Sequence, residues 1–253
     1  MMSKTFLNHE KALLTVMLQC ETPEVAISRI RNANCLGADA YGLQVESLKP
    51  EYRNSDTYKR LFAEMKERPC YVTNYRKKNG EIETDDELAV GLLKLAQSGA
   101  TLVDVMGDLF CRHPEELTED AEAIEKQEKL IQKIHAAGAE VLMSSHILKF
   151  TPAERVLEVA LEQKRRGADI IKIVTGAESM EQQIENLRIT NLLKEKLGAP
   201  FLFLSGGECS LHRRLGMKLG CCMALCVYEH DHLSTPMQPL LSTMKTIRDS
   251  IDF

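Results

Sequence analysis

The feature that most constrains the fold is a phrase that recurs along the chain: an amphipathic helical segment, a Gly-Ala pair and a short apolar run. Glycine suits the position just after a helix, because it adopts a left-handed backbone without steric cost. The apolar run that follows has the length and composition of a buried strand. Alternating helices and strands predict a parallel sheet with right-handed crossovers. The pair occurs at Gly37-Ala38, Gly99-Ala100, Gly138-Ala139, Gly167-Ala168 and Gly198-Ala199.

Eight segments read as strands, and helical patterns lie between them, the clearest over Glu119–Ala137 and Pro152–Arg166 and the last over Pro239–Ile251. Eight βα units in 253 residues predict an α/β protein, a (β/α)8 TIM barrel, as a single domain over residues 1–253. An open doubly wound sheet is the alternative, but it calls for a nucleotide-binding fingerprint that we do not find. The predicted strands are Leu13–Leu18, Asp39–Glu46, Cys70–Tyr75, Leu102–Met106, Glu140–Ser145, Ile170–Thr175, Phe201–Ser205 and Met223–Val227.

Composition narrows the classes of function. The net charge is −5 and there is no basic stripe, which argues against nucleic-acid binding. No apolar run reaches membrane-spanning length and the first residues do not resemble a signal peptide, so we expect a cytoplasmic protein without a membrane partner. The 8 cysteines form no C-x-x-C pair of the metal-site type, and we expect reduced thiols that mostly pack in the core.

The strand from Gly167 to Gly176 carries a lysine, Lys172, at its centre. Ile170 and Val174 share its face of the strand, so the side chain is expected to be buried among aliphatic groups. Burial disfavours the ammonium form and leaves a nucleophilic amine that can form a Schiff base with a ketone or aldehyde. Two structural readings stay open beside it, a lysine that snorkels from the strand end and a lysine paired with Asp104 or Glu178.

In a barrel of this kind the active site lies at the carboxyl ends of the strands. His146 ends the strand that precedes the Lys172 strand, so the two residues are expected on neighbouring strands. A Schiff-base lysine makes an electron sink, and a histidine can move the adjacent proton. A purely structural role for a histidine at a strand end is equally compatible with the sequence.

Two further patterns at this end have two readings each. Ser205-Gly206-Gly207 is typical either of a phosphate-binding backbone cradle or of a tight turn. Glu229-His230-Asp231-His232 contains alternate histidines that suit a metal, but four adjacent polar residues are more often a solvated loop. We therefore predict no metal ligands.

The ends of several strands resemble type I 3-dehydroquinate dehydratase. The first match is a serine two residues before a histidine, with Thr-Pro a few residues later, and the second is a Gly-Ala-Asp-Ile-x-Lys-Ile strand. The third is a late Ser-x-Pro-x-Gln motif, and the fourth is a serine that precedes an Arg-Leu pair by nine residues. Their order runs along nearly the whole chain. The residues concerned are Ser144 to His146 with Thr151-Pro152, Gly167 to Ile173, Ser234 with Pro236 and Gln238, and Ser205 with Arg214-Leu215.

The resemblance implies a barrel enzyme that removes water from 3-dehydroquinate to give 3-dehydroshikimate in the shikimate pathway of aromatic amino acid biosynthesis. By this resemblance Lys172 forms the Schiff base and His146 is the general acid and base. Arg214, Ser234 and Gln238 would hold the carboxylate of a small hydroxy-ketone substrate. It also implies a carbon-oxygen lyase that needs no metal or other cofactor and forms a homodimer.

The chain departs from the family pattern on strands two to four. The family's Glu-x-Arg-x-Asp of strand two falls on Gly42, Gln44 and Glu46, and the strand-three arginine normally two residues after a threonine is absent. In this chain Arg76 comes three residues after Thr73 instead. We expect Gln44, Glu46 and Arg76 to contact the substrate. The family has two acidic residues at the end of strand four, and the corresponding positions of this chain are Gly107 and Leu109. The family's glutamate beyond the strand-three arginine corresponds to Glu81, in a loop of different length.

These departures keep other hypotheses open. A diverged paralogue would apply the same iminium chemistry to another hydroxy-ketone or hydroxy-keto acid. A class I sugar-phosphate aldolase would use Ser205-Gly206-Gly207 for phosphate and would not need His146. A non-catalytic barrel that binds a carboxylated metabolite would tolerate Lys172→Met with little change in affinity.

Overall fold

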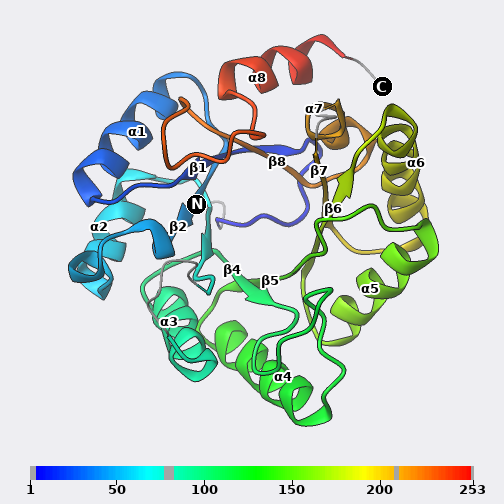
Figure 1. The fold of residues 1–253 in the computed structure, drawn as a ribbon. Helices are drawn as coiled ribbons and strands as arrows, with labels where there is room; N and C mark the ends of the chain where they lie inside the picture. The colour runs from blue at the N-terminus through cyan, green and yellow to red at the C-terminus, as the bar shows by residue number, and fades with distance from the viewer. Residues whose placement is uncertain (1–3, 77–82, 208–210, 252–253) are drawn as a thin grey trace.

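The computed structural model describes residues 4–76, 83–207 and 211–251. Eight parallel strands form one sheet in the order β7-β6-β5-β4-β3-β2-β1-β8, and the helices lie around it in a ring (Figure 1). This confirms the predicted (β/α)8 TIM barrel. The strands are β1 Leu13–Leu18, β2 Ala40–Gln44, β3 Cys70–Thr73, β4 Leu102–Met106, β5 Glu140–His146, β6 Ile170–Ala177, β7 Phe201–Gly207 and β8 Met223–Cys226.

The helices follow the strands in strict alternation. They are α1 Pro23–Cys35, α2 Ser55–Glu64, α3 Asp85–Gln97, α4 Ala121–Ala136, α5 Ala153–Arg165, α6 Met180–Lys196, α7 Leu211–Leu219 and α8 Leu241–Ser250. Two short 3-10 helices, Val45–Ser47 and Pro50–Tyr52, follow β2. In the described part of the chain, none of the helices combines the length and the apolar character needed to cross a membrane.

The predicted strands differ from the observed ones mainly at their ends. The second is shorter than predicted because the chain turns into a 3-10 helix at Val45. The strands β5, β6 and β7 run further, and Ser205-Gly206-Gly207 pairs with Thr175-Gly176-Ala177 of β6. These two glycines therefore continue the sheet as part of β7 and do not form a tight turn there, while their role as a phosphate cradle stays a prediction.

The barrel nearly closes between β7 and β8, the two end strands of the sheet. β1 pairs with both β2 and β8, and the amide of Cys222, just before β8, donates to the carbonyl of Phe201 at the start of β7. The N-terminal segment crosses the opening at the amino end of the strands (Figure 1), where Phe6 is buried and its amide donates to Oε2 of Glu140 at 2.9 Å. This end of the barrel is thus plugged, and polar side chains gather at the opposite end.

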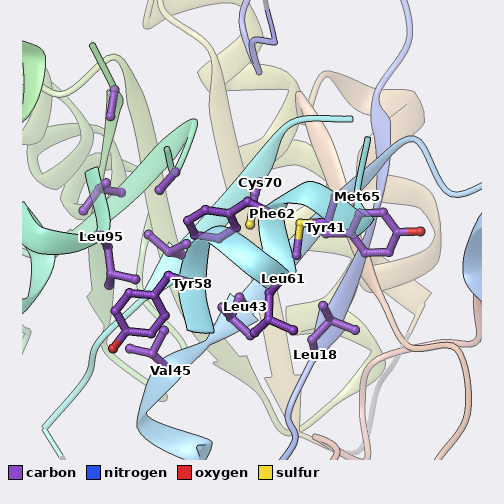
Figure 2. Packing of buried hydrophobic residues seen from close by; sticks show 14 of the residues in the cluster. Leu18, Tyr41, Leu43, Val45, Tyr58, Leu61, Phe62, Met65, Cys70 and Leu95 are labelled. Carbon is purple, nitrogen blue, oxygen red and sulfur yellow. The ribbon is translucent and has the colours of Figure 1, made fainter. Parts of the chain in front are cut away.

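An apolar layer between the strands and the helices forms the larger part of the core. Figure 2 shows one sector of it, in which Leu18, Leu43 and Val45 of the β1–β2 region pack with Leu61 and other side chains of α2. Full burial of such side chains is the main favourable contribution to folding, of roughly 1.5–3 kcal/mol each. The sheet is therefore covered on its outer face, as the continuous apolar strands predict.

Inside the barrel, one row of side chains explains a departure from the family pattern. Met17, Gly42 and Tyr71 are neighbours across β1, β2 and β3. A Cβ added at Gly42 would lie 2.2 Å from Sδ of Met17 and 3.1 Å from Cδ1 of Tyr71. A larger side chain at position 42 would have to displace the end of the Met17 side chain and would press on the ring of Tyr71, which together fill this space.

Candidate active site

Lys172 occupies the middle of β6 and points into the barrel, with 4% of its surface exposed. Its Nζ donates hydrogen bonds to the hydroxyl groups of Tyr75 at 2.5 Å and Tyr71 at 2.9 Å. It also forms an ion pair with Oδ2 of Asp104 at 3.1 Å. Of the roles considered from the sequence, pairing with Asp104 is therefore present.

Asp104 is the acceptor at the centre of this cluster. Both phenols donate to its Oδ2, and Ser144 of β5 donates to its Oδ1 at 2.6 Å. Burial, followed by the charge of Asp104, raises the pKa of Tyr71 and of Tyr75 well above the ordinary value. The two tyrosines are therefore neutral hydrogen-bond donors at physiological pH.

His146 ends β5 and is held by a carboxylate from the loop after β4. Nδ1 of His146 lies 2.7 Å from Oε2 of Glu116, which also accepts from the backbone amide of His146 at 2.9 Å. Burial raises the pKa of Glu116, but its hydrogen bonds with His146 and the charge of the ring outweigh burial and hold that pKa below the ordinary value. Because Nδ1 is engaged, Nε2 is the nitrogen suited to exchange a proton with a substrate.

The histidine and the lysine clusters meet at Tyr75. The ring of Tyr75 contacts the imidazole of His146 edge to face, with 5.2 Å between ring centroids. The hydroxyl group of the same tyrosine contacts Nζ of Lys172. The two residues predicted to be catalytic thus lie on adjacent strands and share one neighbour, which makes a single site at the carboxyl ends of β3 to β6.

A buried network anchors the loop that carries Glu116. Ser145 donates to the backbone carbonyl of Glu116 at 2.8 Å, and a Cβ at Gly107 would lie 2.5 Å from the same oxygen. Arg166, which is buried, donates to the carbonyl groups of Gly107 and Thr118. The glycine at position 107, where the resemblance led us to expect an acidic residue, lets the loop pack directly on the end of β4.

The strand-two residues Gln44 and Glu46 form a second polar group. Thr73 of β3 donates to both carboxylate oxygens of Glu46 at 2.9 Å, and Nε2 of Gln44 donates to Oε1 at 3.2 Å. Burial raises the pKa of Glu46 to about 7. Both side chains predicted to contact substrate therefore lie at the carboxyl end of β2, where they bond to each other and to Thr73.

The guanidinium group of Arg76 is engaged by carboxylates of the protein. It forms ion pairs at 2.7 Å with Asp85, at the start of α3, and with Asp108, which is buried. Burial lowers the pKa of Arg76, but the bonds to these two carboxylates outweigh it and raise that pKa. The structure does not bring Arg76 together with Lys172, and Glu81 lies outside the described residues.

Arg214 and Gln238 line one cavity of about 370 Å³, with Gly207 at the end of β7 among its other walls. Oε1 of Gln238 is buried and has no partner within the described structure. Ser234 is turned elsewhere, because its hydroxyl group donates to the carbonyl of Asp231 and accepts from the amide of that residue. Two of the three residues predicted to hold a carboxylate thus share a cavity.

The two acidic residues of the stretch considered for a metal have a protein partner. Arg29 forms ion pairs with Asp231 at 2.5 Å and with Glu229 at 3.4 Å. Across residues 4–76, 83–207 and 211–251, no three His, Cys, Asp or Glu side chains gather in a way that could hold a metal ion.

Sequence reasoning did not select Tyr71, Tyr75 and Glu116 as site residues. The sequence does contain a signal for the two tyrosines. Tyr71, Thr73 and Tyr75 are spaced two residues apart along strand three, so their side chains lie on the same, inward face. Glu116 has no such signal, because it lies in a loop between β4 and α4 and its φ is +46°. Only the folded loop shows that it reaches His146.

A protein-family model and the sequences of known proteins match this chain. A model of the family described as type I 3-dehydroquinase matches residues 14–252. The chain is 30% identical over 178 residues to a 3-dehydroquinate dehydratase of Klebsiella pneumoniae (strain 342), an alignment that covers 69% of this chain and 65% of that protein. The matched part of this chain therefore spans a little under two thirds of the length of that relative.

Two solved structures have the same fold. The 3-dehydroquinate dehydratase from Geobacillus kaustophilus HTA426 superposes with a TM-score of 0.82 at 16% identity, over 98% of this chain and 95% of that chain. The type I dehydratase from Clostridium difficile, with covalently modified comenic acid, gives a TM-score of 0.80 at 15% identity, over 96% of this chain and 93% of that one.

Proposed function

Because the chain belongs to the type I 3-dehydroquinase family, we propose that it is a Schiff-base lyase in which Lys172 condenses with the ketone of a carboxylated hydroxy-ketone. The leading substrate is 3-dehydroquinate, the compound named for its relatives, and the products are water and an enone. The observation that carries the proposal is the meeting of Lys172 and the His146–Glu116 pair at Tyr75.

The chemistry follows from the two groups. An iminium on Lys172 withdraws electrons and acidifies the adjacent C–H bond. Nε2 of His146 removes that proton and then delivers a proton to the departing hydroxyl group, while Glu116 stabilises the imidazolium that forms in between. Hydrolysis of the iminium releases the enone and restores the amine. The reaction needs no metal or diffusible cofactor.

The carboxylate of the substrate is assigned to the cavity beside Arg214 and Gln238. A guanidinium fork matches the two oxygens of a carboxylate. The unpartnered Oε1 of Gln238 can accept a hydrogen bond from a hydroxyl group of the ligand, and the nitrogen of the same amide is the donor suited to its carboxylate. Ser234 would join this site only after its bonds to Asp231 open.

A diverged paralogue with another hydroxy-ketone or hydroxy-keto acid is the second candidate. It is favoured by the barrel interior next to the lysine, where Met17 and Tyr71 fill the space at Gly42. A substrate hydroxyl group that finds no partner on burial costs about 1–3 kcal/mol. The paralogue reading therefore predicts a substrate with fewer hydroxyl groups. The class I sugar-phosphate aldolase ranks below both, because the family model that matches the chain is that of the type I 3-dehydroquinases.

Borohydride trapping tests the proposal. The protein is incubated with 3-dehydroquinate, reduced, and mapped by peptide mass, with Lys172→Met as the control. We expect an adduct on Lys172 and enone absorbance before reduction. His146→Gln should still form the adduct while the enone signal is lost. An adduct without enone in the wild-type protein would point to the paralogue, and no adduct with any hydroxy-ketone would overturn the lyase proposal.

By the same family resemblance we extend the proposal to a cytoplasmic homodimer that acts in the shikimate pathway. Light scattering after gel filtration tests the dimer, for which the expected mass is twice the 28.5 kDa of the chain. A mass equal to that of one chain would contradict it.

A further inference from the structure

We propose that Tyr75 is a catalytic residue, a phenol that relays protons between Nζ of Lys172 and the carbonyl oxygen of the substrate while the iminium forms. This inference rests on the proposed function, since it assigns a role within Schiff-base formation. It concerns a position two residues after Thr73, where the family resemblance led us to expect an arginine. An arginine cannot accept a hydrogen bond and does not give up its proton in proteins.

The first support is the position of the phenol. Its oxygen accepts a hydrogen bond from Nζ of Lys172 at 2.5 Å and donates to Oδ2 of Asp104. It is thus both an acceptor and a donor within one cluster, which a proton relay requires. Tyr71 makes the same two kinds of bond but is completely buried, whereas Tyr75 is partly exposed at the open end of the barrel.

The second support is the position of His146. Its Nδ1 and its backbone amide are both bonded to Glu116, and its ring contacts the ring of Tyr75. Among the described residues, no hydrogen bond joins His146 to Lys172. The histidine is therefore placed to act at the carbon next to the iminium, and the tyrosine is the group in contact with the nitrogen itself.

In the first half of the reaction, the amine of Lys172 adds to the ketone of the substrate. The ammonium of Lys172 gives one proton to Asp104, which lies 3.1 Å from Nζ. The neutral amine adds to the carbonyl carbon, so that a C–N bond forms and the electron pair of the C=O π bond moves to oxygen. Tyr75 gives its phenolic proton to that oxygen and takes one proton from the nitrogen. The result is a neutral carbinolamine and a restored phenol.

In the second half, the proton held by Asp104 passes through Tyr75 to the hydroxyl group of the carbinolamine. That group leaves as water while the nitrogen lone pair forms the C=N bond. Of the three protons of the starting ammonium, one stays on the iminium and two leave with the water. The restored carboxylate of Asp104 then faces the iminium cation, and no external co-reactant is needed.

The ionisation of the phenol agrees with this role. Burial, and then the charge of Asp104, raises the pKa of Tyr75 well above the ordinary value. The phenol is therefore protonated at neutral pH before substrate arrives. Once Asp104 has taken up a proton, the charge that opposes a phenolate is gone, which makes transient proton loss from Tyr75 easier.

The test is the rate of iminium formation in Tyr75→Phe, with Tyr71→Phe as the matched control. Each variant is mixed with levulinate, a keto acid without a hydroxyl group to eliminate, and quenched with borohydride at increasing times. The adduct on Lys172 is measured by mass. Tyr75→Phe should slow adduct formation about 10²-fold, the usual contribution of a positioned acid or base. Tyr71→Phe should slow it less than about tenfold, since it removes a hydrogen bond but not the relay.

Each outcome is decisive. Adduct formation in Tyr75→Phe at the wild-type rate would overturn the relay and leave the lyase proposal intact. Absence of any adduct in the wild-type protein, with levulinate and with 3-dehydroquinate, would overturn both. If Tyr75→Phe does not fold, a fluorinated tyrosine at position 75 replaces it, because it keeps the shape of the side chain and lowers the pKa of the phenol. The trapping rate and its pH dependence should then shift with the pKa of the phenol, and an unchanged rate and pH profile would overturn the relay.

Discussion

The side-chain carboxylate of Glu116 bonds both to the imidazole ring and to the backbone amide of His146. A single carboxylate oxygen, Oε2, lies 2.7 Å from Nδ1 and accepts the backbone amide hydrogen bond at 2.9 Å. This double contact fixes both the end of β5 and the rotation of the imidazole ring. The carboxylate also stabilises the positive charge that the ring carries between its two proton transfers.

Glu116→Gln should therefore lower kcat and leave KM nearly unchanged. The amide retains a hydrogen bond to the ring but lacks the charge, so the steps that pass through the imidazolium become slower by about 10²-fold. Iminium formation precedes those steps, and the trapped fraction of Lys172 should rise at steady state. Steady-state kinetics on the ketone that the wild-type protein turns over, with borohydride trapping, check this. A raised KM at normal kcat would instead assign Glu116 to substrate binding.

Gly107→Ala should displace the loop that carries Glu116. The new Cβ would lie 2.5 Å from the carbonyl oxygen of Glu116, and backbone cannot retreat as a flexible side chain can. We expect a loss of about 1–3 kcal/mol in the free energy of unfolding, together with a kcat at least as low as that of Glu116→Gln. Urea unfolding and kinetics measure the two effects.

Gly206→Ala is the matched control for that variant. It lies at the end of β7, and the atom nearest to its Cβ would be the carbonyl oxygen of Thr175 at 3.4 Å. Its stability should change little. If Gly206→Ala and Gly107→Ala are destabilised equally, the close contact with Glu116 is not the cause.

Gly42→Ala should be destabilised by contact with Met17 and should be rescued by truncation of that side chain. The new Cβ would lie 2.2 Å from Sδ of Met17, so overpacking is expected to cost about 1–3 kcal/mol. Met17→Ala alone leaves a cavity and is also destabilising. The double variant should be more stable than the sum of the two losses predicts, because each change makes room for the other. Additive losses in urea unfolding would contradict this.

Arg76→Met should destabilise the fold strongly. The substitution leaves Asp108 buried without its cation and frees Asp85 at the start of α3. Removal of one partner from a buried ion pair costs about 3–5 kcal/mol. Asp85→Asn, which leaves the contact with the buried Asp108, should cost clearly less. Equal stability of Arg76→Met and wild type in thermal unfolding would show that these ion pairs contribute little.

The barrel could be predicted from the sequence because its signal is repeated. Each Gly-Ala pair marks the end of a helix and the start of a strand, and the pattern is independent of any single residue. Lys172 and His146 could be assigned to neighbouring strands for the same reason. The strand ends were less predictable, since β2 stops at Gln44 where the chain enters a 3-10 helix, and periodicity carries no information about that turn.

The partners of the two residues could not be predicted in the same way. Glu116 reaches His146 through a loop whose path depends on Gly107, Arg166 and Thr118, which lie far apart in the sequence. The ion pair between Lys172 and Asp104 was one of several options, and the choice depends on the stagger between β4 and β6 around the barrel. Such relations follow from tertiary packing, which local patterns do not encode.

Glu46 should make the stability of the protein depend on pH. Burial raises the pKa of its carboxyl group to about 7, above the value of about 4.3 expected in the unfolded chain. The folded state therefore holds a proton that the unfolded state has released, and the free energy of unfolding falls as the pH rises from about 4 to about 7. The full loss is of the order of 3–4 kcal/mol. Glu46→Gln keeps an oxygen for Thr73 without the titration, so its urea stability should stay flat where that of wild type declines. Parallel curves for the two proteins would show that the carboxylate is ionised throughout.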